Sequence, residues 1–247
     1  MASLHANDST PNVKNIVLVH GAWADGSSWS KVVPLLQAKG FNVVCTQNAL
    51  SGLADDVTIV RRILDAQDGP VILAGHSYGG VIITEAGTHP KVAALVYVAA
   101  FAPDAGESLG SVTQPFPPTP ALNELKPIAD GFLLLSDKGV LEDFAQDLPD
   151  EEKSTMIATQ GPTHNSIFTA TISKPAWREK PSWYAVALND RTINPDYEKH
   201  AAEQMGATTI SLSASHVAML AKPNEVADLI LQAAASVNAV PQLTAAD

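Results

Sequence analysis

The residues from Gly75 to Gly79 form a pattern suited to nucleophilic chemistry: Gly-His-Ser-Tyr-Gly, or G-x-S-x-G. An apolar run, Val71 to His76, leads into the serine, and a stretch that begins Val-Ile-Ile-Thr follows the motif. In a strand, turn and helix of this kind, a sharp turn lifts the serine hydroxyl clear of the sheet. The pattern predicts that Ser77 is the nucleophile of an acyl-transfer reaction. The alternative is a glycine-rich turn that happens to hold a serine.

A serine nucleophile needs a partner, because its hydroxyl is weakly reactive at neutral pH without a histidine base. Open α/β sheets place their ligand crevice at the carboxyl ends of their strands. His216, in the sequence Ser-Ala-Ser-His, follows the last predicted strand directly, and it is the predicted base. Three other histidines lie in the N-terminal tail, at a helix end and within a helix: His5, His89 and His200.

The base in turn needs a carboxylate that orients it. Asp190 closes the predicted strand Trp183 to Leu188 and precedes His216 in the chain, so it is the predicted acid. Two rivals remain open. Asp196 is expected to cap the helix that follows Pro195, and Asp104 lies just past the fourth predicted strand.

Two backbone amides are candidates for an oxyanion hole, which holds the negative charge of a tetrahedral intermediate. The amide of Tyr78 opens the helix after the nucleophile, and that of Ala22 lies in the loop after the first predicted strand. Two histidines beside these positions, His20 and His76, are interpreted as structural residues that brace their turns.

The elements that must position these residues alternate between strand and helix, a pattern typical of a parallel sheet covered on both faces. Six short apolar runs are predicted strands: Asn15–His20, Phe41–Thr46, Val71–His76, Ala94–Ala100, Trp183–Leu188 and Thr208–Leu212. Five longer amphipathic stretches are predicted helices: Ser28–Lys39, Leu53–Gln67, Gly79–Thr88, Pro195–Met205 and Pro223–Ser236.

The alternation stops between the fourth and fifth predicted strands. A loop of this length without structure of its own is unusual in a compact domain, so residues 104–181 are predicted to form an inserted, mostly helical cap. We expect one α/β domain over residues 1–247, with its core at about 15–103 and 182–240. The Pro-rich piece Gln114–Pro120 is interpreted as a stiff connector, and the acidic run Glu142–Glu152 as a solvated helix face.

Composition limits the class of protein. The chain of 247 residues is 46% hydrophobic and 17% charged, which argues against global disorder. Its formal net charge of −11 disfavours nucleic acid and anionic membrane surfaces as partners. The single cysteine, Cys45, forms no internal disulfide, offers no thiolate metal site and is interpreted as a buried apolar residue. Met1–Asn15 lacks the pattern of a secretory signal, so we expect a cytoplasmic protein.

Residues near the nucleophile and in the cap are candidates for a substrate pocket. Most of the candidates are aromatic or apolar, which suits a small apolar acyl or alcohol group. Each of them also has an ordinary packing role as the alternative. They are Trp23, Phe101, Phe116, Phe132, His164 and Trp177.

Taken together, the motifs of this chain resemble those of the α/β-hydrolase fold family. The resemblance rests on four motifs: His-Gly-Ala-Trp after the first strand, Gly-His-Ser-Tyr-Gly-Gly at the third, the Asn-Asp turn, and Ser-Ala-Ser-His near the end. It is closest to the small branch of plant methyl-salicylate-type esterases and hydroxynitrile lyases, with their bacterial relatives. The resemblance implies six parallel core strands, a triad on Ser77, Asp190 and His216, and oxyanion amides from Ala22 and Tyr78.

The lyases of this branch differ at two positions. They have a threonine after the loop histidine and a lysine after the catalytic histidine, where this chain has Gly21 and Val217. Without that lysine nothing obvious stabilises a departing cyanide, so a hydroxynitrile lyase is disfavoured.

We therefore predict a serine esterase that acts on small, mostly apolar carboxylic esters through an acyl-enzyme. No metal and no organic cofactor is expected. The partner is a small-molecule ester, and a homodimer is the assembly to test. Two alternatives stay open: a slow-turnover ligand-binding receptor of the same fold, and an enzyme of this fold with other chemistry, such as a lactone or amide hydrolase.

Overall fold

The computed structural model describes residues 12–239. Some predictions concern residues outside this range and are not addressed by the structure: those on His5, on most of the N-terminal segment Met1–Asn15, and on residue 240. A parallel sheet of six strands forms the centre, in the order β2-β1-β3-β4-β8-β9. The strands are β1 (Asn15–Val19), β2 (Asn42–Cys45), β3 (Val71–Ser77), β4 (Val92–Ala100), β8 (Ser182–Ala187) and β9 (Thr208–Leu212). The predicted α/β-hydrolase fold with six parallel strands is confirmed.

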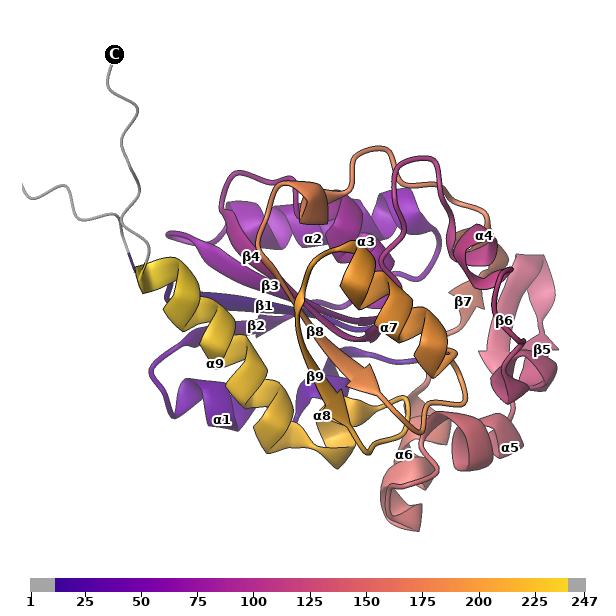
Figure 1. Cartoon of the computed structure of the whole chain (residues 1–247). Helices are drawn as coiled ribbons and strands as arrows, with labels where there is room; N and C mark the ends of the chain where they lie inside the picture. Colours follow the sequence, from indigo (N-terminus) through magenta and orange to yellow (C-terminus); the bar gives the residue numbers. More distant parts are fainter. Residues whose placement is uncertain (1–11, 240–247) are drawn as a thin grey trace, which may run out of the picture.

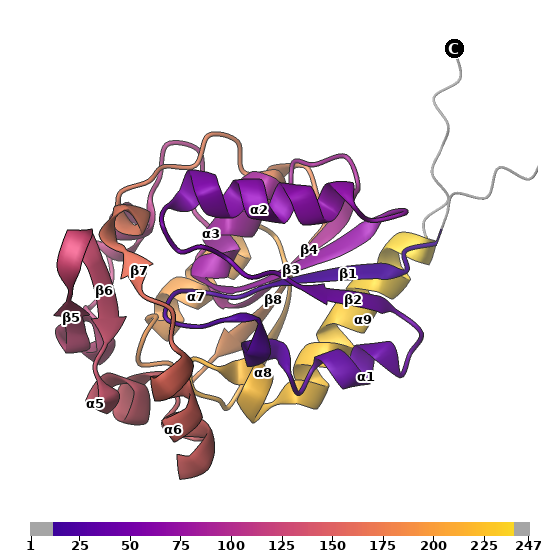
Figure 2. The same cartoon turned by 180° about the vertical axis from the view of Figure 1, so that it is seen from behind.

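Helices cover both faces of the sheet: α2 and α3 on one, α1 and α9 on the other (Figures 1 and 2). Every residue of β1 and of β3 is buried, as expected for parallel strands between two helical layers. The helices of the core are η1 (Gly26–Trp29), α1 (Val33–Gln37), α2 (Leu53–Asp65), α3 (Tyr78–Ala86), α7 (Pro195–Gln204), α8 (Ala218–Ala221) and α9 (Pro223–Ala239).

One predicted helix is divided in two. The stretch Ser28–Lys39 forms the short 3-10 helix η1 and the short α-helix α1 in place of one continuous helix. Pro34 lies in the first turn of α1. Since proline has no backbone N–H, it is tolerated at a helix start but interrupts a helix that would run through it.

The order in which successive strands are added to the sheet reverses between β1 and β3. The chain runs outward from β1 to β2 and then returns to the other side of β1 as β3. Crevices that bind ligands form at such a switch point, outside the carboxyl ends of the strands. The ends of β1 and β3 therefore define the edge where a site is expected.

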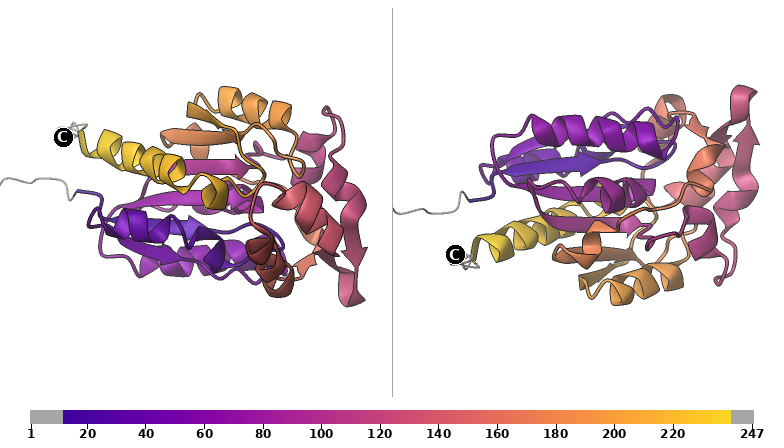
Figure 3. Two further views of the ribbon diagram at one scale, coloured as in Figure 1. Left: turned by 90° about the horizontal axis from the view of Figure 1, so that it is seen from below. Right: turned by 90° about the horizontal axis from the view of Figure 1, so that it is seen from above.

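Residues 104–181, called the cap segment below, lie at that carboxyl edge, opposite the end where α9 finishes (Figure 3). This segment contains a three-stranded antiparallel sheet, β5-β6-β7, which the sequence did not predict. Its elements are α4 (Leu109–Thr113), η2 (Pro120–Glu124), β5 (Leu125–Pro127), η3 (Ala129–Gly131), β6 (Phe132–Leu135), α5 (Asp137–Gly139), η4 (Val140–Phe144), α6 (Asp150–Thr159), β7 (Thr163–His164), η5 (Asn165–Phe168) and η6 (Ala176–Arg178).

Candidate active site

Ser77 lies at the tight junction between β3 and α3. Its backbone has φ of +55° and ψ of −125°, a conformation that costs energy for any residue with a side chain. The turn is possible because Gly75 and Gly79 have no side chains. A Cβ on Gly75 would lie 2.6 Å from the backbone oxygen of Gly79, and one on Gly79 would lie 2.5 Å from that of Val19. The hydroxyl is thereby carried to the carboxyl edge of the sheet.

His216 lies in the loop between β9 and α8. Its Nδ1 donates a hydrogen bond of 2.6 Å to Oδ2 of Asp190, and both side chains are fully buried. Because this bond places the ring proton on Nδ1, Nε2 carries the lone pair of a base. Nε2 is buried and has no hydrogen-bond partner within the described part of the chain, so it is free to take a proton.

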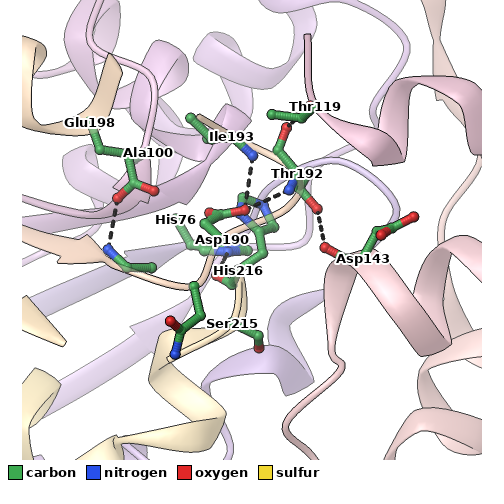
Figure 4. A network of polar contacts seen from close by, with 12 residues as sticks. His76, Ala100, Thr119, Asp143, Asp190, Thr192, Ile193, Glu198, Ser215 and His216 are labelled. Carbon is green, nitrogen blue, oxygen red and sulfur yellow. Dashed lines mark hydrogen bonds and ion pairs between the residues drawn. The ribbon is translucent and has the colours of Figure 1, made fainter. Parts of the chain in front are cut away.

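Asp190 is held in the turn after β8 by its own backbone neighbours. Its Oδ1 accepts hydrogen bonds from the amides of Thr192, at 2.6 Å, and Ile193, at 2.8 Å, while Oδ2 faces His216 (Figure 4). The two oxygens thus have separate tasks. One fixes the carboxylate to the turn, and the other orients the imidazole.

The loop that carries His216 meets the turn that carries Ser77. His76 donates from Nε2 to the backbone oxygen of His216 at 2.9 Å, and the two imidazole rings are 4.6 Å apart. Within residues 12–239, no hydrogen bond joins Oγ of Ser77 to Nε2 of His216. Such catalytic hydrogen bonds are often long in a free enzyme and shorten when the substrate binds.

The two other histidines near the site have structural contacts, in agreement with their interpretation from the sequence. His20 donates from Nδ1 to the oxygen of Gly21 at 2.8 Å and accepts at Nε2 from the amide of Asn48 at 2.9 Å. Burial lowers the pKa of His20 and lowers that of His76 well below its usual range. Both ring nitrogens of His20 are engaged, whereas Nδ1 of His76 is buried without a hydrogen-bond partner within the described residues, and burial disfavours its protonation.

The rival acids have other partners. The carboxylate of Asp104 forms a two-point ion pair with Arg178, which holds its pKa below the usual range. Asp196 is exposed and pairs with Lys199 at 2.9 Å. The expectation that Asp196 caps the helix is wrong: the side chain of Asn194 accepts the amide of Asp196 and is the cap of α7. Of the three aspartates, Asp190 alone bonds to His216.

The candidate oxyanion amides of Ala22 and Tyr78 flank Ser77 on the wall of one cavity. Tyr78 is the first residue of α3, so its amide has no partner inside the helix. Its hydroxyl donates to Oδ2 of buried Asp56 at 3.0 Å, which fixes the residue in place. These positions suit two N–H donors that converge on a carbonyl oxygen bonded to Ser77.

Gly21 leaves the space in which the nucleophile sits. A Cβ added there would lie 2.6 Å from the Cβ of Ser77 and 2.9 Å from the backbone oxygen of His76. We expect Gly21→Ala to lower kcat for ester hydrolysis by about 100-fold, because a displacement of about 1 Å is enough for such a loss. Gly69→Ala is the control, since its added Cβ would meet nothing nearer than 3.7 Å. Steady-state rates and thermal unfolding of both variants test the prediction; equal kcat in the two would contradict it.

A cavity of about 330 Å³ opens beside Ser77 and extends under the cap segment. Three of the predicted pocket residues line it: Trp23, Phe101 and Phe116. Apolar side chains from α4, η5 and the turn after β8 complete the wall, including Leu109, Ile167, Phe168 and Ile193. The Pro-rich piece, which the sequence suggested as a connector, also lines the cavity through Pro117 and Pro118. In the sequence, these prolines directly follow Phe116, and that neighbourhood could have indicated that the Pro-rich piece lines the cavity.

The other three predicted pocket residues do not line this cavity. Phe132 and His164 pack against each other on neighbouring strands of the cap sheet, with ring centroids 5.1 Å apart. Trp177 is buried and donates from Nε1 to the oxygen of Pro103 at 3.2 Å. These aromatic side chains stabilise the cap segment and its junction with the core, a role that composition does not distinguish from substrate contact.

Part of the acidic run contacts the site, whereas its last residues, Asp150–Glu152, begin α6, a helix without a buried residue, in agreement with their interpretation as a solvated face. Asp143 is buried, pairs with Arg191 at 2.7 Å and accepts at its backbone oxygen from Thr192. Asp147 accepts the amide of Ser215 at 2.7 Å. The cap segment therefore holds both the turn that carries the acid and the loop that carries the histidine.

Two further observations concern cofactors and membranes. Within residues 12–239 there is no cluster of His, Cys, Asp and Glu arranged to hold a metal ion. Burial raises the pKa of Cys45 to about 11, which leaves little reactive thiolate at neutral pH. No helix within the same range has the length and apolar character that crossing a bilayer requires.

Comparison with known proteins finds relatives over most of the chain. The profile of the alpha/beta hydrolase family matches residues 16–229. Salicylic acid-binding protein 2 of Nicotiana tabacum is 28% identical over 91% of this chain and 98% of its own length. The pyrethroid hydrolase of Sphingobium wenxiniae is 29% identical over 88% of this chain and 86% of its own. The crystal structure of a pyrethroid hydrolase from Sphingobium faniae superposes with a TM-score of 0.79, at 26% identity, over 91% of this chain and 98% of that one.

Proposed function

This chain belongs to the alpha/beta hydrolase family, and from that premise we propose that it hydrolyses small, mostly apolar carboxylic esters through an acyl-enzyme on Ser77. It is an esterase, and the branch inferred from its motifs is that of its plant and bacterial relatives. The observation that carries the proposed mechanism is the buried pair of His216 and Asp190, which leaves Nε2 of the imidazole free.

In the acylation step, Oγ of Ser77 attacks the ester carbonyl while Nε2 of His216 takes its proton. The amides of Ala22 and Tyr78 hold the negative charge that develops on the carbonyl oxygen. When the intermediate collapses, the C–O bond to the alcohol breaks and the imidazolium returns the proton to the leaving alcohol.

Deacylation repeats these steps with water as the nucleophile. His216 takes a proton from the water, the hydroxide attacks the acyl-enzyme, and Ser77 leaves with the proton. Asp190 remains ionised and stabilises the imidazolium that forms in both halves of the reaction.

The wall of the cavity supports an apolar, uncharged substrate. It includes no Lys, Arg, Asp or Glu side chain among the described residues, and most of it is aliphatic or aromatic. An ionised group placed there loses its hydration without gaining a partner of opposite charge. Relatives named pyrethroid hydrolase and methylesterase agree with the assignment as an ester hydrolase.

We expect the enzyme to discriminate between neutral and anionic acyl groups. An aryl butyrate should be hydrolysed with a kcat/KM at least about 100-fold above that of the matching aryl hemisuccinate, because the buried carboxylate is left unpaired. The leaving group is the same in both esters, so the ratio reports the acyl site alone. Equal kcat/KM for the two esters would contradict an apolar acyl site.

Labelling by a fluorophosphonate tests the nucleophile directly. We expect one covalent adduct per folded chain, on Ser77, since the reagent needs a serine activated by its base. Heat-unfolded protein is the control and should not react. A folded protein that remains unlabelled would count against the mechanism.

The same substrates separate the alternatives kept from the sequence. Several turnovers per enzyme on simple esters distinguish an esterase from a receptor, which would bind tightly and turn over once or slowly. Lactones, aryl amides and a cyanohydrin in the same panel test the other chemistries. The homodimer stays a prediction, which light scattering would test.

A further inference from the structure

Glu198 is a buried acid directly behind the proposed triad. It lies in the first turns of α7 and is 0% exposed. Its Oε2 accepts a hydrogen bond of 2.9 Å from the amide of Ala187, the last residue of β8. Its Oε1 is buried and has no hydrogen-bond partner, and Glu198 takes part in no ion pair, within the described residues.

The environment of Glu198 favours its neutral form. An ionised carboxylate that is fully buried and has no cation beside it is too costly to persist at its ordinary pKa. Burial, and after it the negative charge of Asp190, raise the pKa of Glu198 well above its usual range. The Ala187 amide and the charge of Lys199 oppose these effects.

The contacts of Ala187 connect this acid to the turn of the proposed triad. The Ala187 amide donates to Glu198, and its backbone oxygen accepts the amide of Asp190 at 3.2 Å. Glu198 thus belongs to the network of polar contacts that ends at His216 (Figure 4). Because Oε2 is occupied as an acceptor, Oε1 is the oxygen that can carry a proton toward Asp190.

We propose that Glu198 is a positioning residue, a neutral carboxylic acid whose Oε1–H donates to Asp190 and holds that carboxylate in place beside His216. The proposal rests on the triad under Proposed function. Asp190 then accepts four hydrogen bonds: two from backbone amides, one from His216 and one from Glu198. An ionised Glu198 would instead repel Asp190 and push it from the turn.

The other titratable groups that face Glu198 do not supply a counter-charge inside the protein. Tyr184, on β8, and Tyr197, on α7, are buried phenols whose pKa values are raised by burial, so they stay neutral. Lys199 is half exposed and pairs with Asp196. The proton on Glu198 therefore keeps this carboxyl group neutral next to the charged Asp190.

Protonation can be tested without any activity. A carboxyl whose pKa is raised on folding contributes stability that is present below its unfolded-state pKa and is lost as the pH rises toward its folded-state pKa. Glu198→Gln removes this loss, because the amide is neutral at every pH. We expect the Tm of Glu198→Gln, relative to wild type, to increase as the pH rises above the ordinary glutamate pKa of about 4.3. The control is Glu203→Gln, an exposed residue of the same helix, for which the difference should stay flat.

Positioning is tested by activity with two variants. Glu198→Leu removes the donor, and we expect kcat to fall about tenfold or more while KM stays within about twofold, because Glu198 does not line the cavity. Glu198→Gln keeps an N–H donor toward Asp190 and an oxygen for Ala187, so it should recover most of the lost kcat. The acidic limb of its kcat/KM profile should match that of wild type, because no charge is lost.

The outcomes decide the proposal separately from the esterase mechanism. A flat Tm difference, or an acidic limb displaced to lower pH in Glu198→Gln, would mean that Glu198 is ionised and would overturn the proposal. Unchanged kcat in folded Glu198→Leu would also overturn it. If Glu198→Leu does not fold, the Tm series and the pH profile of Glu198→Gln decide. If folded wild type shows no fluorophosphonate adduct, the proposed mechanism fails, whereas the Tm series still reports the protonation of Glu198.

Discussion

Ser77→Ala will lower kcat for ester hydrolysis by at least about 10⁴-fold, because the members of a triad act as a unit and what remains comes from substrate binding and the oxyanion amides. The loss should appear in kcat, since the alanine leaves the apolar cavity unchanged. Folding should be retained, because alanine keeps the Cβ of Ser77 and removes only the hydroxyl group.

Ser215→Ala is the matched control for this variant. Ser215 is also fully buried, it precedes His216, and its Oγ has no partner within the described residues. Its contact with the cap segment runs through the backbone amide, which alanine keeps. We expect kcat within about threefold of wild type and an intact fluorophosphonate adduct. An active Ser77→Ala enzyme, or loss of the adduct in Ser215→Ala, would show that the nucleophile is misassigned.

Asp190→Asn is the second change with a large expected effect, about 10⁴-fold in kcat. Oδ1 of Asp190 accepts two backbone amides, so the amide oxygen of asparagine must take that position. Its NH₂ group is then forced toward Nδ1 of His216. The imidazole responds by placing its proton on Nε2, where the base is needed, and it can no longer accept the proton of Ser77.

Asp104→Asn serves as its control, because Asp104 was the rival acid from the sequence. It loses the ion pair with Arg178, which is exposed and contributes little to stability. We expect kcat within about threefold of wild type, measured on the same aryl ester. A large loss in Asp104→Asn together with an active Asp190→Asn enzyme would reverse the assignment of the acid.

The sequence alone was sufficient for the strands of the core. All six strands were predicted within a few residues, because buried parallel strands are short apolar runs between turn residues, a signal that is local. Local patterns also singled out Ser77, His216 and Asp190, each of which follows such a run directly. The division of the helix at Pro34 was missed even though proline is a visible breaker.

The site beyond these residues depends on contacts between distant parts of the chain. Glu198 lies in the polar sequence Asp-Tyr-Glu-Lys-His, which resembles a solvated helix surface, yet it is fully buried. Asp143 looks equally exposed in sequence and is buried against the turn of Asp190. Phe132 and Phe116 are the same residue type, and only one of them reaches the cavity.

The amino-acid sequence by itself therefore determined the six core strands, most of the core helices and the residues able to carry the chemistry, because short-range patterns indicate all of them. The cap sheet and the short helix α8 were not predicted. Only the tertiary structure excluded the rival aspartates as partners of His216, decided which aromatic side chains enclose the cavity, and revealed the buried acid Glu198 near the turn of Asp190. The physical reason is that burial and hydrogen-bond partners arise from residues far apart in the chain, and these set the charge and orientation of each group.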